Sequence, residues 1–114
     1  FASNALVYWT FAEPSPDGTG NSTAVARGRL VGQRLEDVRV IFSQVPKVAS
    51  RLHCGSRIAF DRDGHLYVGL GDRYSEKDEA QNLGNHIGKI VRITREGQAP
   101  AGKRAVPPTS HFAA

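Results

Sequence analysis

The sequence has no methionine and only one cysteine among its 114 residues. The single Cys54 excludes an internal disulfide and any metal site built from several cysteines, so we interpret it as a small packed side chain. No apolar run reaches the length of a membrane-spanning helix, and none is expected. The chain begins at Phe1 without a basic and apolar leader, so no signal peptide is visible and we expect the N-terminus to be missing.

Several well-known functional motifs are also missing. The sequence contains no glycine-rich dinucleotide motif, no P-loop, no HExxH zinc motif and no GxSxG nucleophile motif. The 15 Lys and Arg exceed the 11 Asp and Glu, which gives a net charge of +4. Because the basic residues are scattered and match no nucleic-acid module, we expect a solvated surface and no nucleic-acid partner.

The residue pattern that is present predicts short β-strands joined by turn-rich loops. The expected strands are 5–12, 23–31, 35–43, 58–60, 66–70 and 87–94, with one helical turn at 79–83. Such a chain without sustained helical periodicity is typical of an all-β protein; sandwich, barrel and propeller all remain open. A free-standing small β-domain is a further possibility, but the strand at 6–11 is expected to be unpaired, which disfavours it.

The stretch 53–73, HCGSRIAFDRDGHLYVGLGDR, predicts a β-hairpin with polar groups at both ends. Turn residues at 61–64 include Gly64, which is free to adopt positive φ. In a hairpin the start of the first strand lies beside the end of the second, so His53 is expected close to Asp72. A histidine beside a carboxylate is a common way to orient a general base. Arg57 is a candidate to reach a carboxylate, either that of Asp72 or that of a ligand.

Other polar residues give weaker signals. We interpret His86 as a surface or strand-start residue, with a second role near the site as the alternative, and His65 as structural. Asp61, Asp63 and Gly64 share features with a calcium loop, but no acidic residue occupies the later ligand positions, so we reject an EF-hand and predict no metal site.

Two long segments resemble one enzyme family. RLHCGSRIAFDRDGHLYVGLGDR, followed by EAQNLGNHIGKIVRI, closely resembles the soluble PQQ-dependent aldose (glucose/sorbosone) dehydrogenases, and the similarity covers about residues 6–97. The resemblance implies a six-bladed β-propeller, usually exported to the periplasm, that binds pyrroloquinoline quinone (PQQ) and calcium and oxidises aldose sugars at C1 to lactones. It also implies that His53 is the catalytic base and Asp72 its partner. Arg57 stays our candidate cofactor contact because its guanidinium could reach a ligand carboxylate.

The length of the chain limits what this resemblance implies. We expect residues 1–97 to form about one propeller blade and part of its neighbour, and residues 98–114 to be a divergent, unstructured tail. The cofactor-binding basic residues and calcium ligands of the family lie in later blades, so we expect a fragment that is inactive alone. A non-enzymatic propeller segment that binds a carbohydrate or a protein partner is the alternative.

Overall fold

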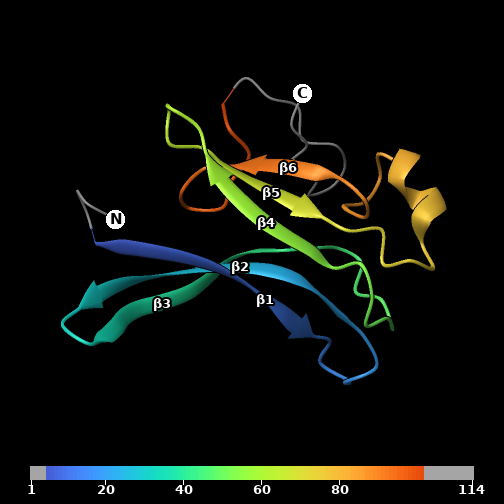
Figure 1. Cartoon of the computed structure of the whole chain (residues 1–114), viewed down its shortest axis with the longest axis horizontal. Helices are drawn as coiled ribbons and strands as arrows, with labels where there is room; N and C mark the ends of the chain where they lie inside the picture. Colours follow the sequence, from blue (N-terminus) through green and yellow to red (C-terminus); the bar gives the residue numbers. More distant parts are fainter. Residues whose placement is uncertain (1–4, 102–114) are drawn as a thin grey trace.

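The computed structural model describes residues 5–101, which form two antiparallel sheets of three strands each. The first sheet has the order β1-β2-β3 and the second has the order β4-β5-β6 (Figure 1). The elements are β1 (Leu6–Pro14), β2 (Asn21–Val31), β3 (Arg34–Ser43), β4 (Gly55–Phe60), β5 (Leu66–Leu70), the 3₁₀ helix η1 (Lys77–Gln81) and β6 (Ile90–Ile93). The all-β prediction is therefore confirmed.

The first sheet is a meander of two hairpins. β1 pairs with β2 along its whole length, so the expectation that the strand at 6–11 is unpaired was wrong. Gly32 and Gln33 form the turn between β2 and β3, as predicted, and Gly32 has φ +62°. Two register shifts in the pairing of β2 with β3 mark irregular positions in this hairpin.

The second sheet contains the predicted hairpin. Gly64, with φ +80°, lies in the turn, and the Asp61 carboxylate accepts the N–H groups of Asp63 and His65, each at 2.9 Å. These bonds explain why Asp and Gly are needed there, because an aspartate can organise a turn through its own side chain. β6 begins at Ile90 and not at residue 87, because Gly88 has φ +67° and lies in a turn.

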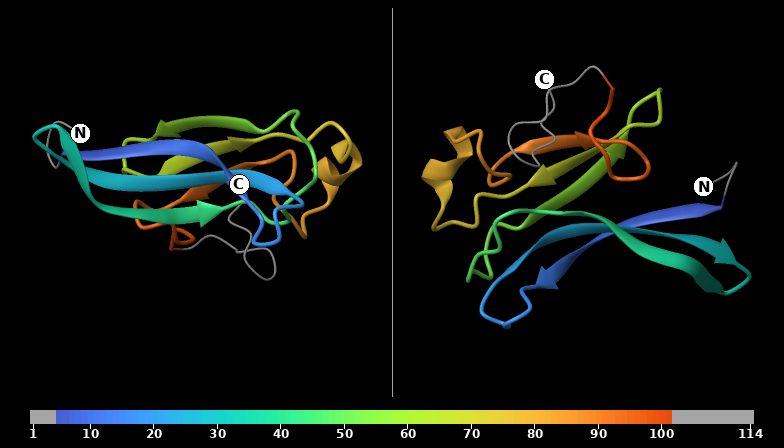
Figure 2. Two further views of the ribbon diagram at one scale, coloured as in Figure 1. Left: turned by 90° about the horizontal axis from the view of Figure 1, so that it is seen from below. Right: turned by 180° about the vertical axis from the view of Figure 1, so that it is seen from behind.

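The hydrophobic core lies between the two sheets (Figures 1 and 2). Alternate residues of β5 point into it, as the period-2 pattern predicted, and each fully buried aliphatic side chain contributes about 1.5–3 kcal/mol. At one edge the rings of Tyr8 and Phe60 meet edge to face, with their centroids 5.0 Å apart. The buried core residues are Val25, Phe42, Leu66, Val68, Leu70, Val91 and Ile93.

The first sheet also has an apolar outer face, which points away from this core. Val25 and Phe42 point into the core, so the neighbouring pair Ala26 and Val40 points the opposite way. Trp9 pairs with Ala26 and therefore lies on the same side. The left view of Figure 2 shows the first sheet in front of the second. We define the outer face as Val7, Trp9, Phe11, Ala24, Ala26, Val38 and Val40; Val38 and Val40 are 54% and 48% exposed.

The predicted start of the tail, residue 98, falls inside the turn that follows β6. The carbonyl of Gln98 accepts the Thr94 N–H at 2.8 Å, so this residue belongs to the turn after β6. Pro100 is buried. The rest of the predicted tail, 102–114, lies outside the described residues. Within those residues no helix is long and apolar enough to cross a bilayer.

Gly71 lies where the hairpin approaches the segment before β4, and a side chain there would collide with backbone. A Cβ atom on Gly71 would lie 1.6 Å from the His53 carbonyl oxygen, whereas one on Gly69 would lie 3.7 Å from its nearest neighbour. We expect Gly71→Ala to lower the free energy of unfolding by about 1–3 kcal/mol or more, because the backbone must move apart. Gly69→Ala serves as the matched control and should change the urea midpoint little. Equal midpoints for the two variants would contradict this packing.

Candidate active site

His53 and Asp72 lie side by side at the open end of the β4–β5 hairpin. The Nδ1 atom of His53 is 2.7 Å from the Oδ1 atom of Asp72, so the predicted proximity is confirmed. Gly55 pairs with Leu70 in the ladder, which brings the residues just before β4 and just after β5 together. The His53 side chain is 55% exposed and that of Asp72 is 33% exposed. The pair is therefore open to a ligand.

The backbone around this pair is held in unusual conformations. His53 has φ +49°, Arg73 has φ +56° and Tyr74 has φ +66°, and each is a non-glycine residue in the left-handed region. Such conformations cost about 1–3 kcal/mol each and persist only where surrounding contacts enforce them. The Gly71 N–H donates to the Cys54 carbonyl at 3.1 Å and supplies one such contact.

Asp72 is held in its ionised form. The N–H of Tyr74 donates to its Oδ1 atom at 2.9 Å, and this bond, together with His53, lowers the pKa of the carboxyl below its ordinary value. An ionised carboxylate can only accept a hydrogen bond, so the Nδ1 atom of His53 carries the proton. The Nε2 atom of a neutral imidazole then keeps its lone pair and can accept a proton.

Two aromatic and basic neighbours were not predicted from the sequence. The Tyr74 ring packs edge to face against the His53 ring, with centroids 5.4 Å apart and an interplanar angle of 89°. The Lys77 ammonium lies 5.3 Å from the centroid of the Tyr74 ring, within the range of a cation–π interaction. The only sequence signal for Tyr74 and Lys77 as neighbours of the pair is that they follow Asp72 closely in the chain.

Arg57 and His86 do not join the pair. Arg57 is exposed, its Cβ atom lies beside Gly69, and among the described residues its side chain forms no ion pair with Asp72. His86 is 2% exposed, and its Nδ1 atom accepts the Val45 N–H at 3.0 Å. Its ring lies 5.1 Å from that of Phe42. The expectation of a surface position for His86 was therefore wrong; it is a buried structural residue.

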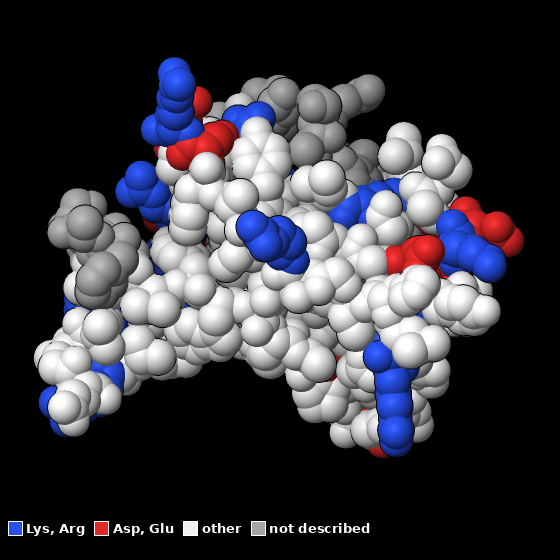
Figure 3. Space-filling model, viewed as in Figure 1, with Lys and Arg blue, Asp and Glu red and all other residues white. Residues whose placement is uncertain are grey.

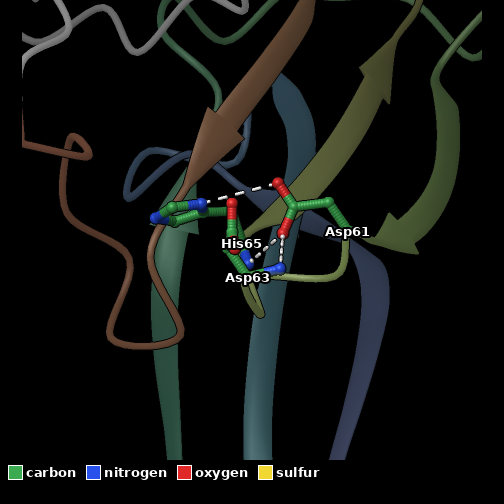
Figure 4. A group of neighbouring side chains, drawn as sticks. All are labelled: Asp61, Asp63 and His65. Atoms are coloured by element: carbon green, nitrogen blue, oxygen red, sulfur yellow. Dashed lines mark hydrogen bonds and ion pairs between the residues drawn. The ribbon is translucent and has the colours of Figure 1, made fainter.

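A group of potential metal ligands lies at the opposite end of the hairpin. Asp61, Asp63 and His65 each offer a ligand atom, and these atoms lie within 4.8 Å of one another (Figure 4). The Oδ1 atom of Asp61 already accepts two backbone N–H groups, and an Arg92 guanidinium nitrogen is 3.2 Å from the Nδ1 atom of His65. Calcium requires six to eight oxygen ligands, so this arginine-flanked turn does not fit it. The Nδ1 atom of His65 also lies 3.5 Å from the Oδ2 atom of Asp61, so its contacts lie within this end of the hairpin.

A polar cleft of about 310 Å³ lies elsewhere, between the β1–β2 loop and the segment that precedes His53. Neither His53 nor Asp72 lines it. Its lining residues are Gly18, Thr19, Gly20, Asn21, Ala49, Ser50 and Arg51. On the face shown in Figure 3 the Lys and Arg side chains are spread apart and do not form one basic stripe.

Comparisons with known proteins agree with the motifs around this pair. The family model described as Glucose / Sorbosone dehydrogenase matches residues 1–110. The aldose sugar dehydrogenase of Escherichia coli is 35% identical over 102 residues, which cover 88% of this chain and 27% of that protein. Its solved apo-form, the soluble aldose sugar dehydrogenase, superposes with a TM-score of 0.84 at 33% identity, over 95% of this chain and 31% of the other.

A second solved relative carries the cofactor. The PQQ-bound aldose sugar dehydrogenase from Streptomyces coelicolor is 28% identical, with a TM-score of 0.76 over 97% of this chain and 31% of that chain. The chain thus spans between a quarter and a third of the length of these relatives. Because the family model matches nearly its whole length, this chain belongs to the glucose/sorbosone dehydrogenase family.

Proposed function

We propose that this chain supplies the catalytic base of a PQQ-dependent aldose dehydrogenase, with His53 as the base and Asp72 as its orienting partner. The observation that carries the proposal is the 2.7 Å contact between His53 Nδ1 and Asp72 Oδ1, beside an exposed imidazole. The Nε2 atom takes the proton of the sugar C1 hydroxyl, and the ionised Asp72 stabilises the imidazolium that forms. Bound PQQ would supply the acceptor for the hydride, the C1 hydrogen with its two electrons, that leaves the sugar.

The described residues offer PQQ a neighbouring proton acceptor but not a complete binding site. PQQ carries several carboxylates, and their recognition requires accessible cations. Arg57 is exposed and remains the candidate contact, whereas Arg73 is fully buried and its guanidinium nitrogens donate to oxygens of the chain itself. We therefore propose that PQQ and calcium are held mainly by segments beyond the described residues, and that the isolated chain shows no turnover.

The proposed architecture is a part of a six-bladed β-propeller. Propeller blades are four-stranded sheets, so two packed sheets of three strands correspond to two incomplete neighbouring blades. The apolar outer face supports this proposal, because every blade of a closed propeller packs against a neighbour on both sides. By family resemblance, we propose a periplasmic or secreted location.

A chimaera tests the catalytic assignment. Replacing the matching segment of the Escherichia coli enzyme with this chain, and adding PQQ and calcium, should give an active aldose dehydrogenase. In that chimaera His53→Gln should lower kcat by about 10²–10⁴-fold, the usual contribution of a general base, with little change in KM. His65→Gln, at the other end of the same hairpin, is the control and should retain turnover.

The same chimaera separates the proposal from its alternative. Unchanged kcat in the His53→Gln chimaera would refute the base assignment. A folded chimaera that binds sugar without oxidising it would favour a non-enzymatic propeller segment. The isolated chain with PQQ is the negative reference for lactone formation.

The outer face tests the proposed architecture. In the isolated chain, Val38→Glu with Val40→Lys should reduce self-association in light scattering, because the exposed apolar surface becomes charged. In the chimaera the same pair should lower the thermal unfolding midpoint, since a neighbouring sheet would cover these positions. Arg39→Gln, on the same strand, is the control. An unaltered chimaera midpoint would contradict a covered outer face.

A further inference from the structure

Arg73 is the largest fully buried side chain among the described residues, and it follows Asp72 directly. No carboxylate pairs with it within residues 5–101. Its guanidinium donates instead to oxygens on two separate segments: to Leu52 O at 3.1 Å, to Asn21 O and Oδ1 at 2.7 Å each, and to Ser50 O. Burying a charged guanidinium without a carboxylate partner is costly unless its N–H groups are hydrogen-bonded. The acceptor oxygens around Arg73 must therefore stay in place for the structure to form.

The backbone of Arg73 contacts the same segment. Its N–H donates to the His53 carbonyl at 3.2 Å, and its own carbonyl accepts the Ser50 hydroxyl at 2.9 Å. Arg73 therefore bonds to Ser50 and Leu52, which precede the proposed base, and to the backbone of the base residue, His53. It also fixes the position of Asp72 through the chain itself.

The imidazole cannot be held in place by burial, because more than half of its side chain is exposed. His53 and Arg73 both occupy the left-handed region, which surrounding contacts must enforce. The bonds from Arg73 are the contacts that join the segment before His53 to the residue after Asp72. Through Asn21, at the start of β2, they also tie both to the first sheet.

We propose that Arg73 is the positioning residue of the His53–Asp72 pair: its buried guanidinium fixes the 50–53 segment so that the imidazole meets the carboxylate through Nδ1. This inference rests on the proposed function for its catalytic meaning, but the geometry it explains can be measured without turnover. The planar guanidinium reaches four acceptor oxygens at fixed angles, whereas the ammonium of lysine is a compact point charge. Lysine should therefore keep the charge and lose the positioning.

The test is the state of the His53 ring in the whole chain, read by ¹⁵N NMR of the imidazole nitrogens. In the unsubstituted chain we expect one tautomer, with the proton on Nδ1 and none on Nε2. In Arg73→Lys the two nitrogen shifts should move toward each other as the tautomers mix, while circular dichroism shows that the chain is folded. Arg92→Lys, which removes a partly buried guanidinium beside His65, should leave the His53 signals unchanged.

A second, milder variant covers the case in which Arg73→Lys does not fold. Asn21→Ala removes the side-chain acceptor of Arg73, together with the hydrogen bond that the Asn21 Nδ2 atom donates to Ser50 O at 3.1 Å, and it keeps the Arg73 guanidinium in place, so it should cause a smaller shift in the same direction. A folded Arg73→Lys chain with the original tautomer would overturn the proposal. So would unchanged signals in Asn21→Ala, if only that variant folds.

The catalytic and positioning proposals fail separately. In the chimaera Arg73→Lys should lower kcat by up to about a hundredfold, the scale of a misplacement of about 1 Å. Full activity of His53→Gln would refute the base assignment whatever the NMR shows. Loss of activity in His53→Gln with an unaltered His53 ring in Arg73→Lys would refute only the positioning role.

Discussion

The close contact between the end of β5 and the segment before β4 is the constraint on which the site depends. Gly71 lies against the His53 carbonyl so closely that no Cβ atom fits between them. This approach lets the ladder bring His53 and Asp72 within hydrogen-bond distance, although both belong to connecting segments. A hydrogen bond alone would not hold an exposed imidazole there, because water competes for the same donor and acceptor. The backbone contacts and the Arg73 side chain hold the pair, which we propose as the catalytic base and its partner.

The two sheets give this hairpin a rigid base. β5 is buried against the first sheet through alternate residues, while the end of the hairpin that carries the pair stays open. The same arrangement leaves an apolar outer face on the first sheet and a half-exposed imidazole on the second. Both surfaces are what a part of a larger assembly would present, and the relatives of this chain are about three to four times as long. The proposed active site is then shared between this chain and segments outside it.

Much of this could be predicted from the sequence because the signals were local. Alternation at 66–70 and the turn residues at 61–64 determine the hairpin, and the hairpin brings the segments that carry His53 and Asp72 side by side. The pairing of β1 with β2 was missed because the sequence of one strand does not show which other strand it pairs with. Ile87 was assigned to a strand because an apolar residue in a buried turn cannot be told from one in a strand by its hydrophobicity. The positive φ of Gly88 makes this segment a turn.

The role of Arg73 could not be read from the sequence for a related reason. The sequence position of an arginine directly after a strand is typical of an exposed surface residue. The burial of Arg73 depends on oxygens of Asn21 and Ser50, which are distant in the sequence. His86 was misplaced in the same way, since its partners Phe42 and Val45 lie on the other sheet or beyond it. Local chemistry was therefore predictable, whereas long-range burial of polar groups was not.

In the proposed reaction the His53 imidazole meets the reacting hydroxyl of an aldose. A crystal structure of the chimaera with PQQ and a bound sugar tests it most directly. We expect the C1 hydroxyl oxygen within about 2.6–3.2 Å of the Nε2 atom of His53, with Nδ1 still bonded to Asp72. A sugar bound with C1 facing another residue, and His53 out of reach, would contradict it.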